Sequence, residues 1–374
     1  MTENHFHDLV DTVTDDTLHR LADLTAPCVS IYLPTNRAHQ DLSHDSLVLR
    51  GLAEDAAAEL AAAEIPDSLT EQILSPVRQL VDDRPFWAEQ GEGLAVFADR
   101  NGHHEFRLRT SPPPMAVVGA HPRLAPILPA VTGADGFFVL AVSLGDVRLF
   151  SATTDSIRQW GLGTIPASVD EMERRHQREN QLQHQHEPPA SSVATFHGHG
   201  GSDAAEVVRD HFLREVATGL RQVIGADNRR PVVVAAVAEY LPVLLDMQLI
   251  PGLLEQGIPG NHDATTPMQL LELSRPLVEE AGAARAETDI ERCSAALASG
   301  KASVDLADIA SAAQQGRVDT LFLPPVVPSD QNSDLSFAAT DLDAACVAAL
   351  RTGADLRPVD APLHGAPAVA LLRY

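Results

Sequence analysis

Lysine is nearly absent from this sequence. Lys301 is the single lysine among 27 lysine and arginine residues, against 52 aspartate and glutamate residues, so the chain of 374 residues has a formal net charge of −25. Nonspecific binding of nucleic acid needs clustered basic side chains that contact phosphates, and the bulk charge argues against it. A local basic patch can still dock on a polyanion. The acidity is also typical of a salt-tolerant, acidic proteome.

Cysteine and long apolar runs are scarce as well. Cys28, Cys293 and Cys346 are too far apart for a disulfide framework or a metal motif, which fits a reducing cytoplasm. No apolar run is long enough to cross a bilayer, and the N-terminus lacks a secretion pattern. We therefore expect a cytoplasmic protein with no membrane partner. No Walker loop or dinucleotide-binding glycine motif is present, so no cofactor is expected.

Helix and strand patterns indicate an α/β protein of three domains. Hydrophobic residues make up 44% of the chain and aromatic residues 4%, so the cores should consist mostly of Ala, Val and Leu. We expect an N-terminal α+β module over 1–130, a middle α/β domain over 131–264 and a C-terminal α/β domain over 265–374. The predicted elements are a strand that ends at Pro34, a helix at 45–65, hairpins turning at Asn101-Gly102 and Gly145-Asp146, and strands at 231–240, 316–324 and 366–374.

Residues 194–220, ATFHGHGGSDAAEVVRDHFLREVATGL, join a glycine-rich loop to an amphipathic helix. Asp203, followed three residues later by Glu206, predicts the start of the helix. Three glycines and two histidines between His197 and Gly201 are entropically costly unless the backbone needs special geometry or a close approach. The apolar residues recur every three or four positions and predict one buried face: Val208, Phe212, Val216, Leu220 and Val223.

Histidines gather before and within this loop. The polar segment 171–192 is expected to be a solvated, mobile loop rich in Gln and His. A metal site is the alternative, but no cysteine or well-spaced carboxylate completes a familiar ligand set, so no metal is predicted. Five of the sixteen histidines fall between residues 176 and 199. The metal interpretation takes four of them as ligands and leaves out His176: His184, His186, His197 and His199.

A third interpretation of the segment is contact with ribosomal RNA. Three arginines, Arg174, Arg175 and Arg178, would contact phosphates or stack on bases together with the histidines. Elsewhere, Asn261, His262 and Asp263 predict a turn capped by the Asn side chain, with a metal or phosphoesterase site as the less favoured interpretation.

Five motifs, in the same order along the chain, resemble one family. They are CVSIYLP, GFFVLAVSLGDVRLF, HGHGGSDAAEVVRDHFLREV, GRVDTLFL and GAPAVALLRY. They are similar to segments that follow one another in the same order in the archaeo-eukaryotic peptide-chain release factors and Pelota. The chain resembles the divergent bacterial branch of that superfamily. The resemblance implies a ribonuclease-H-like middle domain. It also implies a C-terminal α/β/α sandwich related to ribosomal proteins that bind kinked RNA.

The resemblance also implies a role for the glycine-rich loop. In release factors a His-Gly-x-Gly-Gly-Gln-Ser loop enters the peptidyl-transferase centre, and the Gln backbone N–H stabilises the oxyanion. Gly200 and Gly201 match the two glycines, and Ser202 stands at the Gln position, so a backbone donor remains while the water-placing side chain is lost. The Asn-Ile-Lys-Ser tip that reads stop codons is absent from the corresponding region, residues 37–51.

These departures favour a binding protein over an enzyme. The favoured function is docking in the ribosomal A site for hibernation or rescue, without stop-codon reading. The partners would be the ribosome with its rRNA and a translational GTPase; no oligomeric state is indicated. One alternative is a hydrolase of peptidyl-tRNA or another ester that uses Gly200, Gly201 and Ser202, with His197 or His199 as base. Another is an acidic stress protein that kept the fold and lost the ribosome.

Overall fold

The chain forms two compact units. One consists mainly of Gly136–Gly282, and the other of Asp8–Asp135 with Ala283–Tyr374. The computed structural model describes residues 10–11, 13–35, 42–184, 201–325, 333–359 and 366–374.

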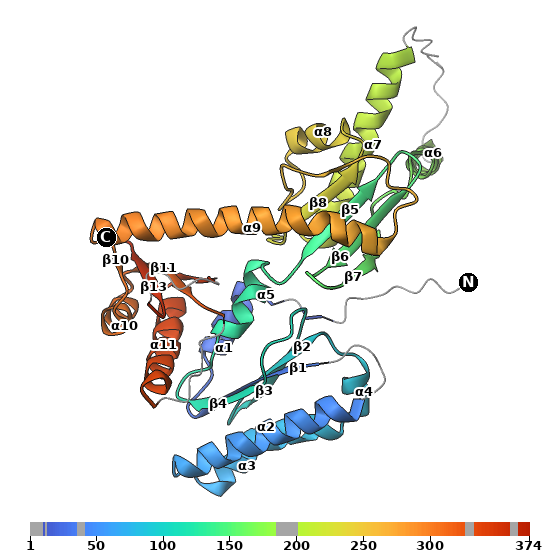
Figure 1. Cartoon of the computed structure of the whole chain (residues 1–374). Helices are drawn as coiled ribbons and strands as arrows, with labels where there is room; N and C mark the ends of the chain where they lie inside the picture. The colour runs from blue at the N-terminus through green and yellow to red at the C-terminus, as the bar shows by residue number, and fades with distance from the viewer. Residues whose placement is uncertain (1–9, 12, 36–41, 185–200, 326–332, 360–365) are drawn as a thin grey trace. The chain divides into compact units, whose positions relative to one another are not determined.

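Helices and strands alternate over much of the chain (Figure 1). The helices are α1 (Asp15–Ala22), α2 (Leu42–Ala62), α3 (Asp67–Asp82), α4 (Arg84–Ala88), the 3-10 helix η1 (Ala125–Ile127), α5 (Leu128–Thr132), α6 (Val169–His184), α7 (Gly201–Ile224), α8 (Tyr240–Met247), α9 (Pro267–Ala298), α10 (Leu306–Gln314) and α11 (Ser333–Arg351). The strands are β1 (Cys28–Pro34), β2 (Gly93–Asp99), β3 (Gly102–Leu108), β4 (Met115–Gly119), β5 (Phe137–Val142), β6 (Val147–Ala152), β7 (Ile157–Trp160), β8 (Val232–Ala236), β9 (Ile258–Pro259), β10 (Ala302–Ser303), β11 (Val318–Leu323), β12 (Asp355–Pro358) and β13 (Val369–Leu372).

A mixed sheet of order β7-β6-β5-β8-β9 forms the centre of the first unit. The predicted hairpin is confirmed, because β5 and β6 pair antiparallel with Val142 opposite Val147 across the turn. Strand β8 lies parallel to β5 on the other side. The apolar run of β5 is buried on both faces, as is typical of a central strand. Phe138 and Leu140 pack on the side of α7 and α8, whereas Phe137 packs with Leu270 and Leu271 of α9.

Close packing anchors α7 to the loop that precedes α6. A Cβ atom added to Gly219 of α7 would lie 2.9 Å from the Cα of Ile165, closer than two such carbons can approach. Ile165 itself is buried among Phe212, Val216 and Leu220 of α7. The C-terminal half of α7 is therefore held against the sheet and against the loop that precedes α6.

The second unit contains the other two sheets. In the antiparallel sheet β3-β2-β1-β4 the predicted hairpin of β2 and β3 is confirmed, and its two turn residues are Arg100 and Asn101, one position before the predicted Asn101-Gly102. Gly102 has φ of 148°, a conformation that favours glycine. Val29, Ile31 and Leu33 of β1 alternate along the strand and pack with α2 and α3. Tyr32, on the other face of β1, belongs to a different core.

Residues from both ends of the chain build that second core. The sheet β10-β13-β11-β12 is mixed, with β11 parallel to β12 and antiparallel to β13. Tyr32 and Phe97 share one buried cluster with Leu321 of β11 and Leu342 of α11. The predicted α/β class is confirmed, with three sheets. The predicted domain limits 1–130, 131–264 and 265–374 stay a prediction.

Candidate functional site

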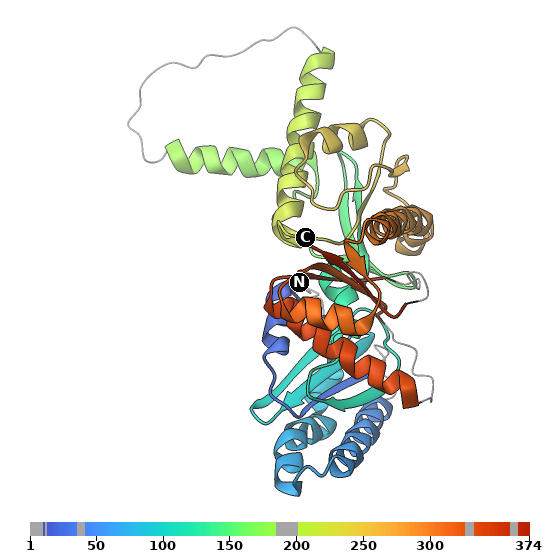
Figure 2. The same ribbon diagram turned by 90° about the vertical axis from the view of Figure 1, so that its left-hand side faces the viewer.

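Two helices flank residues 185–200, where most of the predicted site residues lie. Helix α6 ends at His184, and α7 begins with the backbone of Gly201 and Ser202. Figure 2 shows that the last turns of α6 and the first turns of α7 both extend away from the sheet of their unit. Four predicted site residues lie outside the described residues, as does the side chain of His184: His186, His197, His199 and Gly200.

Helix α6 corrects the expectation of a mobile loop over residues 171–192, because the first part of this segment is helical up to His184. A reciprocal cap starts the helix. The Ser168 hydroxyl accepts a hydrogen bond from the Glu171 backbone N–H at 3.2 Å, and the Glu171 carboxylate accepts one from the Ala167 N–H at 2.7 Å. Serine followed three residues later by glutamate is a helix-start signal that the sequence contains. The buried Met172 fixes the first turn to the core.

Helix α7 differs from its prediction in two respects. It begins at Gly201, so Asp203 lies within the first turn and not at the cap. The buried face begins at Phe212, which is fully buried, whereas Val208 is 39% exposed and Val207 is 68% exposed. The reason is length, because the first turns of α7 project beyond the sheet and have no core to pack on (Figure 1). We call α6 together with residues 201–210 of α7 the α6–α7 arm.

The three predicted arginines occupy different environments within the arm. Arg175 donates to Glu171 at 2.6 Å and to the Thr164 carbonyl at 2.9 Å, so it fastens α6 to the preceding loop. Although burial acts to raise it, the Ala167 N–H and the Arg175 guanidinium hold the pKa of Glu171 below its usual value. Arg174 is exposed and donates to the Asp170 carbonyl. Arg178 is exposed.

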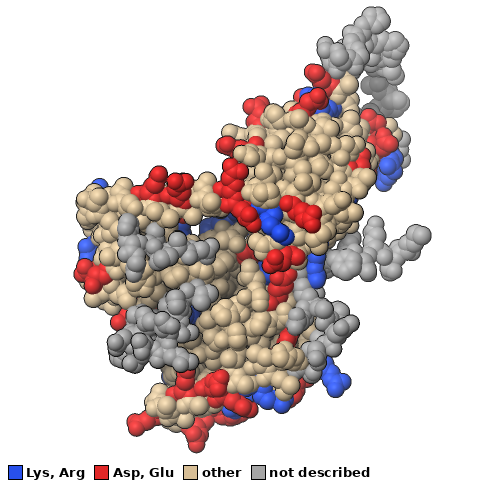
Figure 3. All heavy atoms as spheres, viewed as in Figure 1, with Lys and Arg blue, Asp and Glu red and all other residues tan. Residues whose placement is uncertain are grey.

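Acidic side chains accompany these arginines along α6. Asp170, Glu171 and Glu173 share the helix with the three arginines, so the arm is a region of mixed charge and not a basic patch. Acidic side chains also outnumber basic ones on the face of the molecule that Figure 3 shows. Any contact with a phosphate must therefore come from individual guanidinium groups that reach past their acidic neighbours.

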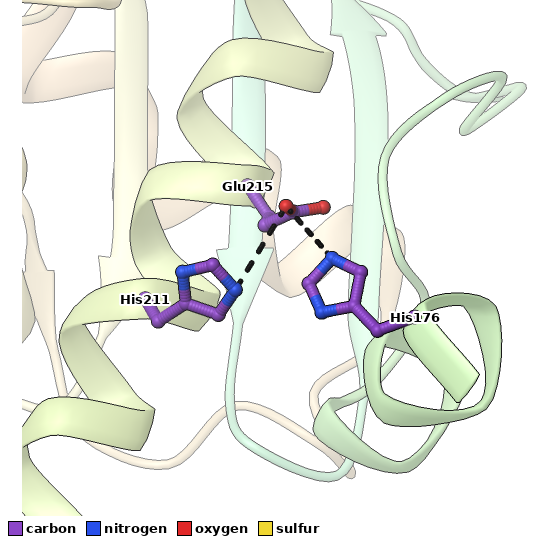
Figure 4. A group of neighbouring side chains, drawn as sticks. All are labelled: His176, His211 and Glu215. Carbon is purple, nitrogen blue, oxygen red and sulfur yellow. Dashed lines mark hydrogen bonds and ion pairs between the residues drawn. The ribbon is translucent and has the colours of Figure 1, made fainter. Parts of the chain in front are cut away.

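Sequence reasoning missed a cluster of His176, His211 and Glu215. The His176 Nε2 lies 3.2 Å from the Glu215 Oε1, and the His211 Nε2 lies 4.0 Å from the same oxygen. The three side chains point toward one another from α6 and α7 (Figure 4). His176 lies 35 positions before His211, so only the fold brings them together. The available signal was the spacing of His211 and Glu215, four residues apart on one helix face.

Two other candidate features are structural. The Asn261 side chain accepts a hydrogen bond from the Asp263 backbone N–H at 2.9 Å, which confirms the predicted turn. The His262 ring nitrogens lie 3.2 Å from the Thr265 hydroxyl and 3.2 Å from the Ile258 carbonyl, so both are engaged locally. The three cysteines are buried, and burial raises the pKa of Cys28 to about 12, which excludes a ready thiolate there.

Comparison with solved structures gives distant matches. Among solved structures, the archaeal translation termination factor aRF1 is 13% identical, with 98% of this chain and 100% of that chain covered and a TM-score of 0.26. Pelota from Archaeoglobus fulgidus is 11% identical, with 98% and 93% covered and a TM-score of 0.30. S. cerevisiae Dom34, a translation termination-like factor interacting with Hbs1, is 11% identical, with 63% of each chain covered and a TM-score of 0.38.

A family model matches the middle part of the sequence. Residues 136–317 match the model of Bacterial archaeo-eukaryotic release factor family 3, and the resemblance drawn from the five motifs is thereby confirmed. The matched residues include α6, α7 and the segment between them. None of the curated proteins matches the chain in sequence. Within the part of the chain that the structure describes, no helix is long and apolar enough to cross a membrane.

Proposed function

We propose that this protein is a ribosome-associated factor that docks in the A site for hibernation or rescue and does not read stop codons. The observation that carries the proposal is the family match over residues 136–317, because this span contains the Gly200-Gly201-Ser202 sequence and both helices that flank it. The arm supports it further, since Arg174 and Arg178 are exposed on α6 and can contact a partner without disturbing the core.

Stop-codon reading is left out of the proposal on two grounds. The region of the decoding tip, residues 37–51, contains no lysine and no Asn-Ile-Lys-Ser sequence. From Leu42 onward this region is the first part of α2, and Leu49 is buried in the core below it. Codon-dependent placement therefore lacks the reader that the family uses, and binding must depend on other contacts.

Docking is preferred to hydrolysis because of Ser202. The backbone N–H at this position can still donate to an oxyanion, but a serine side chain cannot reach a water as glutamine does. The rest of the proposal follows the family. We take residues 131–264 as a ribonuclease-H-like domain, residues 265–374 as an α/β/α sandwich of the kind that binds kinked RNA, and a translational GTPase as a further partner.

Ribosome binding by arm variants tests the proposal. Arg174→Ala combined with Arg178→Ala should weaken co-sedimentation with vacant ribosomes about 100-fold, because two charge-assisted contacts of about 1.5 kcal/mol each are lost. Arg158→Ala with Arg221→Ala is the matched control, since it removes the same charge from exposed sites on β7 and α7 of the same unit. Arg175→Ala is kept separate, because it also breaks the contact of α6 with Thr164.

Two results would contradict the proposal. Equal losses in the arm pair and the control pair would mean that binding senses only net charge. No association of the wild-type protein with ribosomes from growing, starved or cold-shocked cells would leave the family fold without its ribosomal role.

A further inference from the structure

Helices α6 and α7 present three metal-ligand side chains to one point. The nitrogen and oxygen atoms of His176, His211 and Glu215 that could bind an ion all lie within 4.8 Å of one another. The two imidazole rings are 5.2 Å apart between centroids and face the same carboxylate. Figure 4 shows one imidazole coming from α6 and the other imidazole and the carboxylate coming from α7.

We propose that His176, His211 and Glu215 bind a divalent transition metal of the zinc type. Ligand atoms about 2.0 Å from a tetrahedral zinc ion lie about 3.3 Å from one another. The separation of 3.2 Å between His176 Nε2 and Glu215 Oε1 already matches that value. The 4.0 Å between His211 Nε2 and the same oxygen requires a closure of less than about 1 Å, within reach of side-chain rotation.

The ligand chemistry selects the class of metal. Two imidazoles and one carboxylate suit zinc and its neighbours in the transition series, whereas calcium and magnesium prefer oxygen ligands throughout. His211 and Glu215 are one helical turn apart on α7, so their spacing is set before any metal binds. The three side chains are between 36% and 49% exposed, which leaves one side open for water as a fourth ligand.

The metal would tie α6 to α7. Both helices flank residues 185–200, and His176 and His211 lie near the middle of α6 and of α7. With the ion bound, the ends of the two helices would be fixed relative to each other by coordination and not only by the His176–Glu215 hydrogen bond of 3.2 Å. This role is independent of ribosome binding, so it can be measured on the isolated protein.

Another histidine–glutamate pair in the chain provides the matched control. His103 Nε2 lies 3.3 Å from Glu105 Oε2 on β3, the same distance class as His176 and Glu215. The described residues around it supply no third ligand that completes a group. It therefore represents a partly exposed histidine–glutamate contact without a third ligand among the described residues.

Metal binding by the full-length protein tests the proposal. Equilibrium dialysis against zinc, read by elemental analysis, should give one ion per chain. Cobalt should give the visible absorption of a tetrahedral site. His176→Asn, His211→Asn and Glu215→Gln should each weaken zinc binding by about 100-fold, and His103→Asn should leave it unchanged. Three separate ligand variants are used so that misfolding of one, seen by circular dichroism, does not decide the outcome.

The histidines of residues 184–199 are the competing source of zinc binding. A variant with His184, His186, His197 and His199 all changed to Asn should keep the one tight ion. The proposal is overturned if this variant loses that ion while Glu215→Gln keeps it. It is also overturned if wild type and His103→Asn both bind less than one zinc ion at micromolar concentrations.

Discussion

The α6–α7 arm and the Arg123–Asp343 pair differ in how far their charged side chains are exposed to solvent. In the arm, Arg174 and Arg178 are exposed beside acidic neighbours. In the second unit, the Arg123 Nε lies 2.9 Å from the Asp343 Oδ2, and the two side chains are only 13% and 8% exposed. The Arg123 carbonyl also accepts a hydrogen bond from the buried Tyr32 hydroxyl at 2.6 Å.

This contrast separates charges that maintain the fold from charges that are free for a partner. A buried ion pair that loses one member leaves a desolvated charge, so neither member can leave the other to bind a ligand. Exposed guanidinium groups contribute little to stability and can exchange water or a carboxylate for a phosphate. We therefore expect the arm to contact a partner's phosphates, although the net charge of the chain is −25.

The largest expected effect comes from breaking the buried pair. Arg123→Ala should lower the free energy of unfolding by about 3–5 kcal/mol, because Asp343 would stay buried without its partner. Chemical denaturation followed by circular dichroism measures the change. Arg178→Ala, the exposed counterpart in the arm, should change it by less than about 0.5 kcal/mol. Similar losses in the two variants would remove the distinction between the two regions.

Two positions on the face of α7 that the sequence predicted to be buried should give the next largest difference in the free energy of unfolding. Phe212→Ala should cost about 3–5 kcal/mol, because Phe212 is fully buried against β5 and β8. Val208→Ala, one helical turn earlier, should cost less than about 1 kcal/mol, since Val208 is 39% exposed. The comparison requires denaturation curves for both variants. A cost for Val208→Ala as large as for Phe212→Ala would mean that the arm is packed in solution.

The pH dependence of stability sharpens the description of the buried pair. Burial raises the pKa of Asp343 from 3.8 to about 7, although the charge of Arg123 acts to lower it. Between these values the folded chain keeps a proton that the unfolded chain has lost, so stability falls as pH rises. Relative to Asp343→Asn, the free energy of unfolding of the wild type should therefore fall between about pH 4 and pH 7. An increase over that range would mean that the ion pair outweighs burial.

Salt should have the smallest effect. Self-repulsion at a net charge of −25 destabilises the compact state, and salt screens it. The melting temperature should rise by a few degrees between dilute buffer and molar potassium chloride. If the melting temperature stays level or falls, charge repulsion does not lower the stability of this fold. A salt-tolerant, acidic proteome is then sufficient to explain the composition.

Local patterns predicted the strands and hairpins well. The β2–β3 and β5–β6 hairpins, the helix over 45–65 and the apolar run of β8 were all visible because short-range signals determine them. Helix α6 was missed although Ser168 and Glu171 mark its start, since its Gln- and His-rich composition favoured a loop. Local capping outweighed composition there.

Packing determined what the sequence could not show. The periodicity that placed Val208 on a buried face was correct for the helix, but the sheet ends before that turn. The cluster of His176, His211 and Glu215 depends on where α6 crosses α7, which no spacing in the sequence reveals. Likewise, Arg175 was grouped with Arg174 and Arg178 by proximity in sequence, whereas its contact with Thr164 sets it apart.

Peptide release on programmed ribosomes tests the central claim most directly. Purified protein would be added to ribosomes that carry peptidyl-tRNA with a stop codon in the A site, and both bound protein and released peptide would be measured. We expect the protein to bind vacant and stalled ribosomes and to release little peptide, because Ser202 replaces the family's Gln and residues 37–51 lack its decoding tip. Release at a rate comparable to a dedicated factor, abolished by Gly201→Ala, would contradict docking without termination and establish the peptidyl-tRNA hydrolase instead.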